Sequence, residues 1–122
     1  MKRILTLLTS ICALVGCKGS DMFQSVDAEH FAQIIEDTTV VRLDDRTDAE
    51  YQQGHIPGAI LIDVTQSAFI DKAKQQLPKE KTIALYCRSG RRSKTAAQLL
   101  AKEGYKVVEL NAGFNSWKGE VE

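Results

Sequence analysis

Short apolar runs alternate with amphipathic helical patterns along most of this chain of 122 residues. Four runs rich in β-branched or apolar residues are predicted to be strands, at residues 39–43, 59–63, 82–86 and 105–110. Helices are predicted after Asp27, at a capping box formed by Thr47 and Glu50, over residues 65–77 and 93–103, and briefly from Phe114. This alternation predicts an α/β fold in which a parallel sheet carries helices on both faces.

Length and charge limit the classes of protein that fit. The chain is 43% hydrophobic and 26% charged, which is typical of one small globular domain. It has 16 basic and 16 acidic residues, so its zero net charge gives no reason to expect a nucleic-acid partner.

The N-terminal segment has the pattern of an export signal. Lys2 and Arg3 precede an apolar run at residues 4–15 that is too short to span a bilayer. The run ends in Leu-Val-Gly-Cys17, which resembles the lipobox of bacterial lipoproteins, and an ordinary secretory signal is the alternative. We expect a signal peptide at residues 1–16, a lipidated Cys17 with a short tether at 17–22, and one domain at 23–122. In lipoproteins, a lysine such as Lys18 after the lipidated residue implies the periplasmic face of the outer membrane.

Only one cysteine remains for chemistry. Cys12 lies in the predicted signal and Cys17 would carry the lipid, so Cys87 has no partner for an internal disulfide. Such a cysteine in an exported chain indicates either pairing with another molecule or a reactive thiol. The alternative is a buried structural residue, which is the commonest fate of a free cysteine.

The segment around Cys87 favours a reactive thiol. Cys87 directly follows the strand predicted at 82–86, and the helix predicted from Ser93 follows a short loop. Ligands bind at the carboxyl ends of parallel strands, where loop amides and a helix N-terminus attract anions. We expect this environment to lower the pKa of the Cys87 thiol. The loop residues are Arg88, Ser89, Gly90, Arg91 and Arg92.

Four segments together resemble the single-domain rhodaneses, the thiosulfate sulfurtransferase family. The loop from Cys87 to Ser93 (CRSGRRS) resembles the active-site loop of that family. Residues 44–51 (DDRTDAEY) resemble its D-V-R-x-x-x-E-Y pattern, and residues 54–59 (GHIPGA) match its G-H-I-P-G-A segment. Residues 110–117 (LNAGFNSW) resemble its L-x-G-G-F-x-x-W ending. The resemblance covers about residues 23–122 and implies a rhodanese-like fold.

The resemblance also implies a mechanism without a metal or other cofactor. Cys87 would take a sulfur atom from a small anionic donor such as thiosulfate and pass it to cyanide, a thiol or a protein dithiol. Amides of residues 88–92 would hold the charge of the transferred sulfur. The arginines of the loop would bind the donor, and Arg46 is a further candidate for substrate binding.

Two alternatives and two departures from the family pattern qualify this expectation. A cysteine phosphatase or arsenate reductase needs the pattern C-x5-R, but Ser93 stands at the arginine position and Arg92 comes one residue early. A tethered persulfide carrier or binding module is the other alternative.

Asp45 replaces a residue that is usually apolar, and Ala112 replaces a glycine. His55 and Trp117 are expected to be structural.

Overall fold

The protein forms one parallel sheet with strand order β1-β5-β4-β2-β3. The computed structural model describes residues 22–122, so the predicted signal peptide and Cys17 lie outside the described residues. The strands are β1 (Gln24–Val26), β2 (Val41–Asp44), β3 (Ile60–Leu61), β4 (Thr82–Tyr86) and β5 (Lys106–Leu110). The helices are α2 (Ala28–Ile34), α3 (Asp48–Gln52), α4 (Phe69–Gln76), α5 (Arg91–Lys102) and the short 3-10 helix η3 (Phe114–Ser116).

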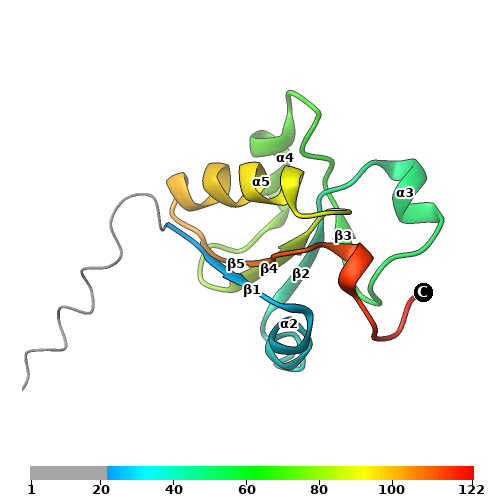
Figure 1. Ribbon diagram of the computed structural model, residues 1–122. Helices are drawn as coiled ribbons and strands as arrows, with labels where there is room; N and C mark the ends of the chain where they lie inside the picture. Colours follow the sequence, from blue (N-terminus) through cyan, green and yellow to red (C-terminus); the bar gives the residue numbers. More distant parts are fainter. Residues whose placement is uncertain (1–21) are drawn as a thin grey trace, which may run out of the picture.

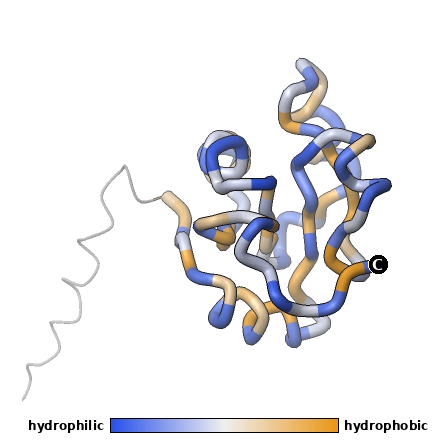
Figure 2. Tube along the Cα trace, turned by 45° about the vertical axis from the view of Figure 1, so that its right-hand side comes forward, coloured by the Kyte–Doolittle hydropathy of each residue, from blue (hydrophilic) through white to orange (hydrophobic). Residues whose placement is uncertain are grey.

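Helices cover both faces of the sheet, as the alternating pattern predicted (Figure 1). On β4, Ile83 and Leu85 belong to a core cluster that includes the inner faces of α4 and α5. Ala84 and Tyr86 point to the opposite face and pack with Phe31 of α2. Figure 2 shows hydrophobic residues in short stretches separated by hydrophilic ones, which fits strands buried between helices that keep one exposed side.

Two predicted helix starts are confirmed by their capping bonds. Asp27 precedes α2, and its carboxylate accepts a hydrogen bond from the amide of His30 at 3.0 Å. Thr47 and Glu50 form the predicted capping box at the start of α3. Each cap satisfies amide groups that have no partner within the first helical turn.

The structure also differs from the prediction in three places. Strand β1 was not predicted, because its three residues are mostly exposed and gain their order by pairing with β5. Helix α4 begins at Phe69 rather than near 65, since the Asp63 carboxylate accepts bonds from the amide and hydroxyl of Thr65 and holds a turn there. Helix α5 begins at Arg91 rather than Ser93, directly after Gly90.

No helix within residues 22–122 has both the length and the apolar composition needed to cross a membrane.

Candidate functional site

The site lies at the carboxyl ends of the neighbouring strands β2 and β4. Cys87 is the first residue after β4, and Asp45 is the first residue after β2. The amide of Asp45 donates to the carbonyl of Tyr86 at 3.0 Å, so the chains stay side by side past the ends of the strands. This is the edge at which parallel sheets bind ligands, as the sequence predicted.

The sulfur of Cys87 accepts hydrogen bonds from the loop that follows it. The amide of Gly90 lies 3.1 Å from Sγ, and the amide of Ser93 lies 3.3 Å from it. Burial alone would raise the pKa of the Cys87 thiol, but hydrogen bonds from Ser93, Gly90 and Ser89 outweigh it and lower the pKa. Cys87 is therefore a buried cysteine, 1% exposed, that is nevertheless prepared to ionise.

Segments near the C-terminus hold this loop in shape from behind. The carbonyl of Cys87 accepts from the amide of Phe114 at 2.8 Å, and that of Arg88 accepts from Asn115 at 3.0 Å. Because these carbonyls are bonded on the outside of the loop, the amides of the following residues can turn toward the sulfur. Gly113 has a φ of +69°, and a Cβ there would lie 2.4 Å from the carbonyl oxygen of Arg88. The positive φ that glycine tolerates thus allows a close backbone contact at Gly113.

Gly90 makes an equally close contact at the other end of the loop. Its φ of +100° is left-handed, and a Cβ would lie 1.9 Å from the carbonyl oxygen of Asn111. Only glycine fits this position, and the position brings its amide to the Cys87 sulfur.

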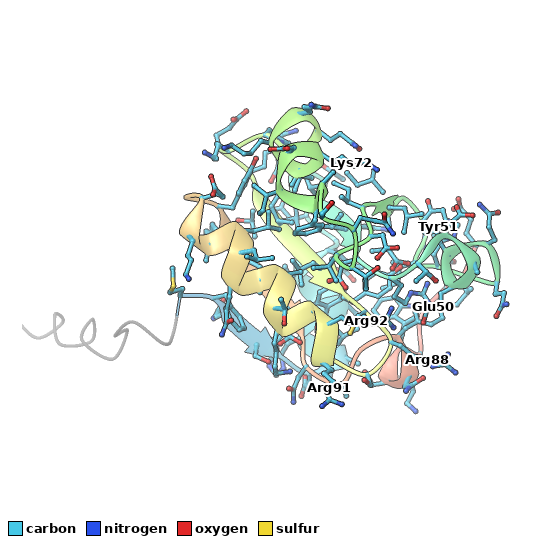
Figure 3. The ribbon with its side chains drawn as sticks, turned by 90° about the horizontal axis from the view of Figure 1, so that it is seen from above. Glu50, Tyr51, Lys72, Arg88, Arg91 and Arg92 are labelled. Atoms are coloured by element: carbon cyan, nitrogen blue, oxygen red, sulfur yellow. The ribbon has the colours of Figure 1, made fainter. Side chains whose placement is uncertain are left out.

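The three arginines of the loop have different surroundings (Figure 3). Arg92 forms two hydrogen bonds with Glu50 of α3, at 2.8 and 3.0 Å. Arg88 lies 3.9 Å from the same carboxylate and its side chain is 65% exposed. Arg91 is exposed and lies apart from this group at the start of α5. The hydrogen bonds from Arg92 keep the pKa of Glu50 at about 2, against an ordinary 4.5.

Arg46 is buried rather than presented freely to a ligand. Its guanidinium bonds both carboxylate oxygens of Asp44, with the shortest contact at 2.7 Å, and it also donates to the carbonyl of Gly54. It lies 4.4 Å from the centre of the Phe114 ring. Tyr86 donates its hydroxyl to the same Asp44 carboxylate at 2.8 Å. This network of contacts joins β2, β4 and η3.

A small cavity of about 180 Å³ opens beside the loop. Both Arg46 and Arg88 reach its wall, so two of the candidate substrate-binding arginines meet there. Neither Asp45 nor Cys87 belongs to this wall, and Cys87 is almost fully buried. The full lining consists of Arg46, Glu50, Gln53, Gly54, Arg88, Phe114 and Asn115.

Sequence reasoning missed the role of Glu50. It was identified only as part of a capping box, whereas it also pairs with Arg92 and lines the cavity. Its position in the E-Y part of the quoted pattern was the available signal. His55 stacks on Tyr51 with ring centres 3.6 Å apart, and Trp117 packs edge-on against Phe31, so both make the structural contacts expected of them.

Comparison with known proteins identifies the family. Residues 27–120 match the model of the rhodanese-like domain. The chain is a rhodanese-like protein. It is 36% identical over 98 residues to a sulfurtransferase of Allochromatium vinosum, an alignment that covers 79% of this chain and 89% of the relative.

A second relative and a solved structure are also similar to this chain. The putative sulfur carrier protein YrkF of Bacillus subtilis is 33% identical over 99 residues, covering 80% of this chain and 52% of that protein. The crystal structure of a rhodanese-like domain protein from Staphylococcus aureus superposes with a TM-score of 0.71 at 26% identity, covering 82% of this chain and 97% of the other. These likenesses support sulfur transfer as the general activity and the rhodanese-like fold as its scaffold.

Proposed function

We propose that this protein is a sulfurtransferase that moves a sulfane sulfur from thiosulfate or a similar small anion to a thiophilic acceptor through a persulfide on Cys87. The observation that carries the proposal is the Cys87 sulfur, which accepts backbone amides at 3.1 and 3.3 Å and has a lowered pKa. A thiolate held in this way is a ready nucleophile.

The first step forms the persulfide. The Cys87 thiolate attacks the outer sulfur of thiosulfate, a new S–S bond forms, and the bond from that sulfur to the sulfonate breaks. Sulfite leaves with the electron pair of the broken bond, so the step needs no other oxidant or reductant. The amides of the loop stabilise the negative charge on the terminal sulfur.

In the second step an acceptor removes the transferred sulfur. A thiolate or cyanide attacks the terminal sulfur of the persulfide, and Cys87 returns as a thiolate. The two steps predict ping-pong kinetics with cyanide or a dithiol as second substrate. The physiological acceptor that we propose is a thiol or protein dithiol.

Thiosulfate uptake can be tested by intact mass. After incubation of the chain with thiosulfate, the mass should rise by one sulfur atom, and cyanide should remove it. The matched control is Cys87→Ser, which keeps the volume of the side chain but lacks the nucleophile. Sulfur uptake in Cys87→Ser would overturn the assignment of Cys87.

Arg88 is the arginine that we assign to donor binding. It lines the cavity and is largely exposed, whereas Arg92 is already paired with Glu50. Arg88→Ala should raise KM for thiosulfate about tenfold, because a hydrogen bond to a charged group contributes about 1.5 kcal/mol or more. Arg91→Ala removes the same charge outside the cavity and should leave KM within about twofold. Equal effects of the two substitutions would show that only general charge attraction acts.

The position of Arg92 argues against the phosphatase alternative. Its guanidinium is held by Glu50 rather than turned to the sulfur of Cys87. The carrier alternative shares the persulfide and is favoured by the near-complete burial of Cys87 and by the likeness to YrkF. Steady turnover with thiosulfate and cyanide indicates an enzyme, whereas one sulfur per chain without turnover indicates a carrier.

We further propose that the protein is an exported lipoprotein, anchored through Cys17 on the periplasmic face of the outer membrane. The support is the basic start, the short apolar run and the Leu-Val-Gly-Cys17 sequence. Expressing cells should incorporate labelled palmitate into the chain, and Cys17→Ala should abolish the label. Label that persists in Cys17→Ala would contradict this anchor.

A further inference from the structure

Asp45 places a buried carboxyl group just after the end of β2. The residue is 0% exposed, and neither carboxylate oxygen has a hydrogen-bond partner among residues 22–122. An unpartnered buried carboxylate is costly, since it loses its hydration and gains no bond in return. The sulfur-transfer mechanism proposed above gives the Asp45 carboxyl no role, and the family pattern has an apolar residue at this position.

The register of the sheet places Asp45 beside the nucleophile. Asp44 of β2 pairs with Tyr86 of β4, and the amide of Asp45 donates to the Tyr86 carbonyl, so the next neighbours are Asp45 and Cys87. Side chains alternate between the faces of a sheet. Asp44 and Tyr86 meet on the α2 face, so Asp45 and Cys87 both point to the α5 face.

Hydrogen bonding decides which of these two neighbours carries a charge. The Cys87 sulfur accepts two backbone amides, whereas Asp45 accepts none. Two adjacent buried anions repel each other, so only one of them ionises readily. The amides favour charge on sulfur, and burial without partners favours a neutral carboxyl.

We propose that Asp45 holds, as a carboxylic acid, the proton that the Cys87 thiol gives up, so that the pair carries a single negative charge located on sulfur. The proton balance is Cys87–SH plus Asp45–COO⁻ giving Cys87–S⁻ plus Asp45–COOH, with no change in net charge. Asp45 acts through Cys87 and is a positioning residue. This inference rests on the proposed function, since it concerns the same nucleophile.

The other charged groups around Asp45 already have partners. Glu109 of β5 accepts from Ser93 Oγ at 2.7 Å and from Lys94 at 3.1 Å. Arg92 of α5 is bonded to Glu50.

Asp44, the neighbour of Asp45 on β2, is bonded to Arg46 on the opposite face. Burial, with the nearby Cys87 charge adding to it, raises the pKa of Asp45 well above its ordinary range.

The pair can be observed by ¹³C NMR of the full chain with labelled aspartate carboxyls and no sulfur donor present. Asp45→Asn identifies the Asp45 resonance by its loss, and Asp45→Val provides the same assignment with the apolar residue type of the family. We expect the Asp45 resonance to titrate well above the exposed aspartates. In Cys87→Ser, which has no thiolate, its midpoint should fall by about one pH unit or more, the threshold for coupled titration. Asp71→Asn, an exposed change of the same charge, should leave the midpoint unchanged.

A second measurement reads the charge of the pair from the side of sulfur. The rate of Cys87 alkylation by anionic iodoacetate, divided by that for neutral iodoacetamide, should drop at least threefold as Asp45 ionises at high pH. In Asp45→Asn the ratio should stay flat over the same range.

An Asp45 that titrates with the exposed aspartates, or a midpoint unaffected by Cys87→Ser, overturns the proposal. Because both experiments use the resting protein, a failure of sulfur uptake would leave their outcome intact and would count against the proposed function alone.

Discussion

Replacing Gly90 by alanine should damage both the stability of the domain and the nucleophile. A left-handed φ costs an alanine about 1–2 kcal/mol. The new Cβ would also lie 1.9 Å from the carbonyl oxygen of Asn111, so the two atoms must separate by about 1 Å to reach a tolerable 3.0 Å. A shift of that size lengthens the Gly90 N–H to Cys87 Sγ contact from 3.1 Å to about 4 Å and breaks it.

Gly104→Ala is a matched control for the cost of the backbone angle. Gly104 has a φ of +96°, and a Cβ there would meet only the end of a lysine side chain at 3.9 Å. We expect Gly104→Ala to lower the free energy of unfolding by about 1 kcal/mol. Gly90→Ala should lower it by about 2 kcal/mol more, because the loop loses a charged hydrogen bond as well.

Urea unfolding, followed by far-UV circular dichroism, measures this difference. The pH dependence of iodoacetamide alkylation measures the nucleophile, and the apparent pKa of Cys87 should rise in Gly90→Ala alone. If the two alanine variants were equally stable and alkylated alike, the reasoning about the loop would be refuted.

Three other substitutions test the charged groups. The Arg92 guanidinium holds the pKa of Glu50 at about 2, so the stability from this pair is present above about pH 4.5 and is lost as pH falls toward 2. The free energy of unfolding of Glu50→Gln should therefore be about 1 kcal/mol lower than that of the native chain at pH 6. In acid titrations the two free energies should become equal near pH 2. Burial raises the pKa of Asp45 in the folded protein. Above about pH 4 this carboxyl therefore ionises more readily in the unfolded state, which stabilises the unfolded state relative to the folded one. Asp45→Val should stabilise the fold by about 1–3 kcal/mol at pH 7 and by less below pH 4, as measured by urea midpoints. Arg46→Lys should lower the free energy of unfolding by about 2 kcal/mol, because lysine cannot bond both oxygens of Asp44; calorimetry should show the lower Tm.

Much of the fold was predictable because its signals are local. The strands at β4 and β5 and the caps at Asp27 and Thr47 follow from periodicity and from short-range hydrogen bonds. Strand β1 was not predictable in this way, because the order of Gln24–Val26 depends on β5, more than 80 residues away. The predicted start of α4 was wrong because the Asp63 carboxylate accepts a hydrogen bond from the amide of Thr65 and holds a local turn there.

The sequence predicted where the candidate site lies, but not which of its charged side chains pair with each other. The end of a buried strand and the loop around Gly90 located the nucleophile. Hydrogen bonds from the loop lower the pKa of Cys87, as the sequence predicted, but the pairing of Arg92 with Glu50 was not predicted. Which charges neutralise each other depends on side chains from different elements, and no spacing within one element encodes it.

The outer contacts of the loop have a consequence for local opening of the structure. The amides of Phe114 and Asn115 bond the carbonyls of Cys87 and Arg88, so exchange of these two amides with deuterium requires the loop to separate from η3. Their exchange rates therefore report how often the loop around the Cys87 sulfur opens without global unfolding. A ligand that closes the site would slow both rates together, whichever donor it was.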